Sequence, residues 1–200
     1  MNKRLISSTL KTAALVCAAA VLFSCQMTQP YQVSEGPVMQ TAEASDIFVE
    51  CTFLDQKTIE ARHGFSDNPF LSPHLTITPL RMMVFELKIT NNDSAPLRLD
   101  IRDISFYYND RRYSPMSTVQ MEQKIDNFSE SRTTVRENRV ARSYMLPNVT
   151  HIEGNSKETG YIVFMDSFRD RGDGELILGF TTEGRNPVAE VNFNYSFIMK

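Results

Sequence analysis

The sequence predicts a mainly β fold, an antiparallel β-sandwich with one helical insertion, and three observations support it. Apolar and polar residues alternate in several short segments, most clearly in 83–90, and this period of two is typical of half-buried strands. Clusters of Gly, Pro, Asn and Asp separate seven to nine such segments. Strand–helix–strand units do not recur, which favours an antiparallel sandwich over an α/β fold.

The first 24 residues have the three parts of a secretory signal. Positive charge comes first, an unbroken apolar run covers 13–23, and the small Ser24 precedes Cys25. The basic residues of this segment are Lys3, Arg4 and Lys11. The run is too short to span a bilayer, which needs about 20 apolar residues. We therefore expect residues 1–24 to be a cleaved signal peptide.

The order Leu22-Phe23-Ser24-Cys25 resembles the lipobox of bacterial lipoproteins. The resemblance implies that Cys25 is acylated, and two or three acyl chains anchor a protein stably to a membrane. The residue after Cys25 is Gln26 and not Asp, which resembles the pattern of outer-membrane lipoproteins in enteric bacteria. This pattern leaves open whether the domain faces the periplasm or the cell surface. A plain signal peptide is the alternative.

Composition bounds what the mature chain can bind. Removing residues 1–24 leaves 176 residues with 18 basic and 24 acidic side chains, a net charge of −6. An acidic domain is a poor candidate for nucleic acid or for lying flat on anionic lipid. We expect one domain, residues 46–200, on a flexible tether, residues 25–45. An ordered arm packed on the domain through Tyr31 and Val38 is the alternative for the tether.

Two stretches interrupt the strand pattern. Residues 55–79, after the strand 47–54, predict a long irregular connection with a short strand-like piece at 75–78. The second is the insert at about 117–145, where Met121, Ile125 and Phe128 share one helical face. Ser117 and Gln120 are expected to cap that helix, and a second piece, helical or disordered, is expected at 130–144. Loops on a rigid sandwich carry recognition, so both stretches together are the predicted binding region.

The remaining segments are strands with identifiable irregularities. In 97–108 the alternation changes phase after Asp103, which predicts a β-bulge or a crossing between sheets, and Asn109-Asp110 predicts a hairpin turn. Residues 160–165 and 176–180 are apolar on both faces and are therefore expected to be central strands. Residues 191–197 alternate and form the last strand.

Residues 85–91 with 97–100, followed by 158–164, resemble the immunoglobulin-like domains of bacterial lipoproteins and secreted antigens. In those domains a strand ends in an Asn-x-Ser turn, and a Gly-aromatic-x-x-Phe strand comes later. The resemblance implies an immunoglobulin-like sandwich. It implies fold far more than function, because many such domains have no known activity.

Catalytic signatures are absent from the sequence. His63, His74 and His151 have no metal-ligand spacing, and no seryl nucleophile motif or phosphate-binding glycine loop occurs. Cys51 is the one cysteine left after processing and acylation, and its strand pattern predicts a buried small hydrophobe. We expect no metal, no cofactor and no enzymatic activity; a hydrolase is the last-ranked alternative.

Two motifs are candidate binding residues. If 130–144 is helical, four arginines share one side and could meet phosphate head groups, an acidic glycan or an acidic partner; a solvated face is the alternative. These are Arg132, Arg136, Arg139 and Arg142. Arg171-Gly172-Asp173 resembles the integrin-recognition tripeptide and would have to be presented at a hairpin tip. The alternative is a tight turn in which Gly172 and Gly174 supply positive φ.

These observations predict a lipid-anchored envelope lipoprotein that works as a non-catalytic binding, structural or assembly module. Its expected partners are the membrane, through the lipid on Cys25, and an envelope protein. A surface-exposed adhesin or antigen that contacts host proteins through Arg171 to Asp173 is the alternative.

Overall fold

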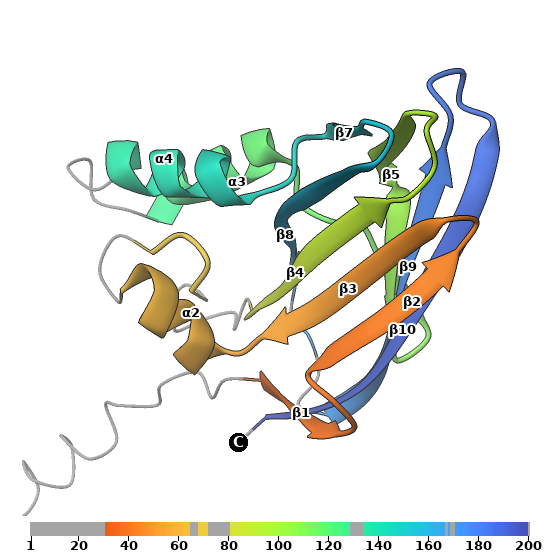
Figure 1. Cartoon of the computed structure of the whole chain (residues 1–200). Coiled ribbons are helices and arrows are strands. Elements are labelled where there is room, and N and C mark those ends of the chain that lie inside the picture. The colour runs from red at the N-terminus through yellow and green to blue at the C-terminus, as the bar shows by residue number, and fades with distance from the viewer. Residues whose placement is uncertain are drawn as a thin grey trace, which may run out of the picture.

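The computed structural model describes residues 31–64, 68–71, 81–128, 134–166, 168 and 171–199, and within them two antiparallel sheets pack as a sandwich (Figure 1). Sheet A has the order β1-β10-β9-β5-β6, with β7 beside the other half of β5. Its strands are β1 (Tyr31–Glu35), β5 (Leu97–Tyr108), β6 (Arg111–Tyr113), β7 (Val149–Ile152), β9 (Arg171–Thr181) and β10 (Pro187–Met199). Sheet B has the order β2-β3-β4-β8. Its strands are β2 (Met39–Ala44), β3 (Ile47–Leu54), β4 (Arg81–Asn91) and β8 (Ser156–Asp166).

The main core lies between the sheets and is rich in aromatic rings. Phe106 of sheet A contacts Phe85 and Phe164 of sheet B at centroid distances of 5.5 and 5.1 Å, and all three are fully buried. Alternation along β10 contributes Val191, Phe193, Tyr195 and Phe197 to the same core. The predicted sandwich is therefore confirmed, while the finer immunoglobulin-like assignment stays a prediction.

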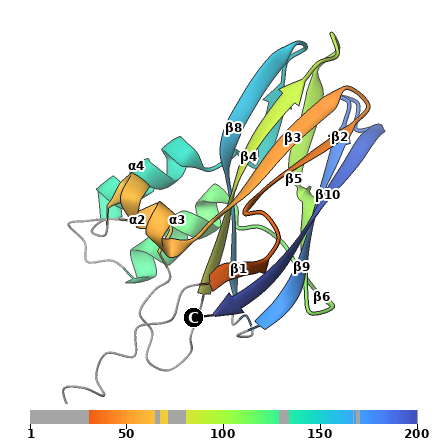
Figure 2. The same ribbon diagram turned by 60° about the horizontal axis from the view of Figure 1, so that its bottom comes forward.

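A second core lies on the outer face of sheet B, beneath three short helices (Figures 1 and 2). The helices are α2 (Gln56–His63), α3 (Thr118–Phe128) and α4 (Thr134–Tyr144). Val84 and Val163 of the sheet are fully buried against Met121 and Ile125 of α3 and their neighbours. No helix in the described part of the chain is long and apolar enough to cross a membrane.

Local sequence signals explain the helix ends and turns. The Ser117 Oγ accepts from the Gln120 N–H at 3.1 Å, and the Gln120 side chain accepts from the Ser117 N–H at 2.8 Å, which confirms the predicted capping box. Asn109 and Asp110 have φ values of 49° and 63°, as a two-residue hairpin turn requires. The pairing of β5 with β9 shifts register between Leu99 and Ile104, and both halves of β5 stay in sheet A, so the phase change marks a bulge or irregularity and not a crossing between sheets.

The predicted tether is wrong from Tyr31 onward, because residues 31–35 and 39–44 form strands. Tyr31 pairs with Met199 in sheet A and is 5% exposed, with its ring against Tyr108 and Phe197 at 6.4 Å. β2 pairs with β3 over its whole length. The physical reason is that β1 pairs with β10, at the far end of the chain, and this pairing buries the aromatic ring of Tyr31.

Two further expectations need correction. The connection after Leu54 is not wholly irregular, because Asp55 caps α2 by accepting from the Thr58 N–H at 2.8 Å; the piece at 75–78 lies outside the described residues. Residues 160–165 lie on β8, which is an edge strand of sheet B and not the predicted central strand. They are apolar on both faces because helices cover the outer face, and backbone N–H groups of Met116 and Leu146 close the β8 edge at 2.7 and 3.0 Å.

Candidate functional site

The predicted arginine face exists on α4, although Arg132 lies outside the described residues. Arg136, Arg139 and Arg142 are all exposed on this helix. The Arg142 guanidinium forms an ion pair with Glu122 of α3, so part of the charge ties the two helices together. The role of this face in binding stays a prediction.

The tripeptide Arg171-Gly172-Asp173 does not lie at a hairpin tip. It opens strand β9 and pairs with residues 196–198 of β10. Gly172 has no positive φ, so the turn interpretation is wrong as well. A Cβ at Gly172 would lie 2.3 Å from the Asn109 side chain, so close approach explains the glycine. The condition for integrin-type presentation is therefore not met.

The other candidates are cysteines, histidines and a possible metal site. Cys25 and His74 lie outside the described residues. Cys51 is fully buried, and burial raises the pKa of its thiol to about 12, which makes it unreactive. Within the described part of the chain no three His, Cys, Asp or Glu side chains are grouped so that they could hold a metal ion.

The two stretches expected to form the binding region do come together, over sheet B. His63 of α2 contacts Tyr144 of α4 at a centroid distance of 4.4 Å, and the Lys124 ammonium of α3 donates to the Pro69 carbonyl at 2.8 Å. Lys124 is 8% exposed, and burial lowers the pKa of its ammonium to about 8. The contacts among α2, α3 and residues 68–71 thus form a packed layer.

A charged cluster extends this layer to the sheet. The Arg62 guanidinium donates to Glu86 at 2.8 Å and to the Tyr161 hydroxyl at 3.0 Å. His63 lies 3.3 Å from the same hydroxyl, and burial together with the charge of Arg62 lowers the pKa of His63. These side chains partner one another, so the cluster holds α2 on the sheet.

The outer face of sheet A is different, because no described helix covers it (Figures 1 and 2). Two hollows of about 590 and 600 Å³ lie on this face and share Tyr107 of β5. We call the two together the trough. Along β9 it runs from Asp173 to Thr181, about 26 Å at the usual rise of a strand.

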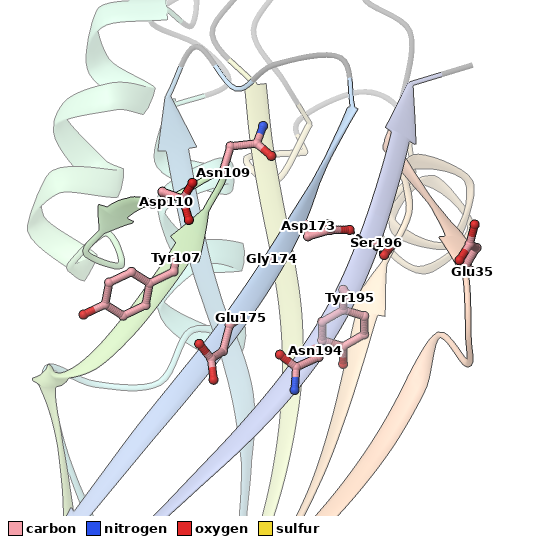
Figure 3. A pocket seen from close by; sticks show the side chains of 10 residues that line it. All are labelled: Glu35, Tyr107, Asn109, Asp110, Asp173, Gly174, Glu175, Asn194, Tyr195 and Ser196. Atoms are coloured by element: carbon pink, nitrogen blue, oxygen red, sulfur yellow. Dashed lines mark hydrogen bonds between the residues drawn. The ribbon is translucent and has the colours of Figure 1, made fainter.

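The first hollow, shown in Figure 3, is strongly acidic, and we call it the acidic hollow. Glu35, Asp110, Asp173 and Glu175 contribute carboxylates, and no described lining residue is basic. Asn109, Asn194 and Ser196 add amide and hydroxyl groups. The residues come from β1, the β5–β6 turn, β9 and β10, so the sheet order brings them together.

The second hollow, which we call the mixed hollow, carries both charges. Arg102, Arg112, Asp103 and Glu190 line it together with Ile177 and Pro187. Sequence reasoning did not identify the trough. The available signal was the run of polar residues at alternate positions of β10, Glu190, Asn192, Asn194 and Ser196, which marks the outward face of that strand alone.

Comparisons with known proteins give structural likenesses only. No family model and no curated protein matches the sequence. The fold is similar to ycdA of Bacillus subtilis, provisionally assigned as a lipoprotein, with 13% identity, 81% of this chain covered and a TM-score of 0.45. The match covers 39% of the ycdA chain.

Two further likenesses are a functionally unknown Listeria monocytogenes protein and a DUF4426 family protein of Pseudomonas aeruginosa. The first has 13% identity, covers 85% of this chain and 88% of the other, and has a TM-score of 0.42. The second has 8% identity, coverage of 82% and 97%, and a TM-score of 0.38. At these scores none of the likenesses carries an argument about function.

Proposed function

We propose that this chain is a lipid-anchored envelope module that binds a partner through the trough and catalyses no reaction. One observation carries the proposal: helices cover sheet B, whereas the outer face of sheet A is open and hollowed. Side chains on a rigid sheet are held in fixed positions, which suits them for recognition. A hydrolase that uses a cysteine nucleophile or a histidine base is less well supported, because neither hollow has a described lining His or Cys.

Anchoring through acylated Cys25 is part of the proposal. Tyr31, the first residue of β1, is six residues after Cys25, so a fully extended chain between them spans about 22 Å at most. The domain would therefore be held close to the membrane. That membrane would be the outer membrane if Gln26 directs sorting as it does in enteric bacteria. Cys25→Ser should abolish fatty-acid labelling and release the chain from membranes, whereas the matched Cys17→Ser should change neither. Equal labelling of Cys25→Ser and the unaltered protein would refute the anchor.

Site-specific photocrosslinking in intact cells tests the binding face. A photoreactive amino acid is placed at Tyr107 or Asn194 in the trough, and at Val119 or Val135 on the helices as controls. Val119 and Val135 are 55% and 69% exposed, so the controls are at least as accessible as Tyr107, which is 37% exposed. We expect one common species from both trough positions that is absent from both controls and rebinds the purified chain. Crosslinks from the helices alone would contradict the proposal.

A further inference from the structure

The trough has an unequal charge balance. Six carboxylates and two guanidiniums are among its described lining residues. The carboxylates are those of Glu35, Asp103, Asp110, Asp173, Glu175 and Glu190, and the guanidiniums those of Arg102 and Arg112. An occupant of this face therefore meets a strongly negative surface.

The two arginines are already engaged. The Arg102 guanidinium donates to the buried Asp100 at 2.6 Å, and this interaction holds the pKa of Asp100 well below its usual range. The Arg112 Nε donates to the Ser105 hydroxyl at 3.0 Å. Arg102 thus shares Asp100 with the buried Arg98, and Arg112 is held by a neutral group, so both guanidiniums are fixed in place while the trough keeps its excess of carboxylates.

The carboxylates of the acidic hollow have no cationic partner among the described residues. Asp173 accepts from the Ser196 hydroxyl at 2.6 Å, and Glu175 accepts from the Asn192 amide at 3.2 Å. Both donors are neutral, so the negative charge is left uncompensated. The carboxylates of Glu35 and Asp110 make no hydrogen bond or ion pair within the described part of the chain.

We infer that the trough binds a basic, extended polypeptide segment of a partner protein. The inference rests on the proposed function and names its partner class. An extended chain rises about 3.3 Å per residue, so about eight residues match the run from Asp173 to Thr181. Tyr107 lines both hollows and supplies an aromatic ring on which an arginine side chain can stack.

Other occupants fit the charges less well. A single metal ion needs clustered ligands, which the described residues do not provide. A neutral glycan would remove water from Glu35, Asp110 and Glu175 without supplying a counter-charge, and the desolvation of unpaired charges is costly. A basic segment supplies a cation at each of these positions.

The test uses the full chain purified in detergent and a labelled ten-residue peptide that alternates Arg and Ser. Fluorescence anisotropy should give at least tenfold tighter binding than for the matched Glu–Ser peptide at 50 mM salt. Binding should weaken about fivefold or more at 200 mM salt, because screening shortens the reach of the charges. A four-residue Arg–Ser peptide should bind at least tenfold more weakly, because it is too short to contact both hollows.

A matched pair of triple variants separates the trough from net charge. Glu35→Gln, Asp110→Asn and Glu175→Gln together should weaken peptide binding at least fivefold. The control combines Glu43→Gln, Asp46→Asn and Glu158→Gln, none of which lines the trough, and should bind within twofold of the unaltered protein. Asp46 and Asp110 both occupy left-handed turn positions, at φ 62° and 63°, where asparagine is well accommodated.

Equal weakening by both triples, or no binding of the Arg–Ser peptide, would overturn the inference. Binding of a chito-oligosaccharide hexamer in place of the peptide would assign the trough to glycans. In either case, photocrosslinks from Tyr107 and Asn194 would still support the trough as the binding face. Failure of the peptide inference can therefore be told apart from failure of the proposed function.

Discussion

The two outer faces of the sandwich differ in how their side chains are used. On sheet B, the outward side chains Val84 and Val163 are fully buried under helices, and Tyr161 is hydrogen-bonded to Arg62. On sheet A, the outward residues Tyr107 and Glu175 line hollows open to solvent. One face therefore contributes to stability, whereas the other can change without unfolding the domain. On β8 the apolar residues of both faces reflect this cover of helices and not a central place in the sheet.

Truncating one aromatic residue on each face would give the largest contrast. Phe70 is 1% exposed and packs against His63 and Tyr161, so Phe70→Ala should cost about 3–5 kcal/mol of unfolding free energy. Tyr107→Ala on the open face should cost less than about 1 kcal/mol. Urea unfolding followed by circular dichroism measures both. Equal losses would break the distinction between a structural and a free face.

Asp100 shows that part of sheet A is structural despite the open face. It is 2% exposed and accepts from Arg98 and Arg102, and Asp100→Asn would leave the buried Arg98 without its counter-charge. We expect a loss of about 3 kcal/mol at pH 7.

The pKa of Asp100 is lowered on folding, so its stabilisation is present above its unfolded value of about 3.9 and is lost as the pH falls below that. The difference between Asp100→Asn and the unaltered protein should narrow from pH 7 toward pH 2 in urea titrations. Asp103→Asn, an exposed neighbour, should stay within about 0.5 kcal/mol at every pH. If the difference in unfolding free energy between Asp100→Asn and the unaltered protein is the same at every pH, the pKa of Asp100 is not lowered on folding.

Lys124 sharpens the description of the covered face. Burial lowers the pKa of its ammonium to about 8, whereas the unfolded value is about 10.4. The unfolded state binds more protons between these values, so this residue should raise stability by about 1–3 kcal/mol from pH 7 to 10.5. Lys124→Met should lack this rise in urea unfolding at the two pH values. If the unfolding free energy of Lys124→Met rises from pH 7 to 10.5 as much as that of the unaltered protein, the ammonium is not buried.

Local patterns were enough to predict most of the fold. Alternation predicted β3, β4 and β10, and the Ser117–Gln120 pair predicted the start of α3, because both signals depend on neighbouring residues. Tyr31 was misassigned to a tether because its strand partner is Met199, at the far end of the chain. The glycines of 171–174 were misread as turn residues, since the contacts of Gly174 with Phe106 and Phe197 are long-range.

The trough could not be predicted for the same reason. Tyr107, Glu175 and Asn194 come from three strands that are neighbours only through the order of sheet A. The sequence shows which side of each strand faces outward, but not which strands lie side by side.

Hydroxyl-radical footprinting of two tyrosines tests the central claim, that the open face is the one that binds, most directly. Tyr107 in the trough and Tyr144 on the helices are 37% and 44% exposed, so their oxidation rates in the purified chain should be similar. In native envelopes we predict that oxidation of Tyr107 falls at least threefold while that of Tyr144 is unchanged. Protection of Tyr144 with Tyr107 unaffected would contradict the account and place the partner on the helices.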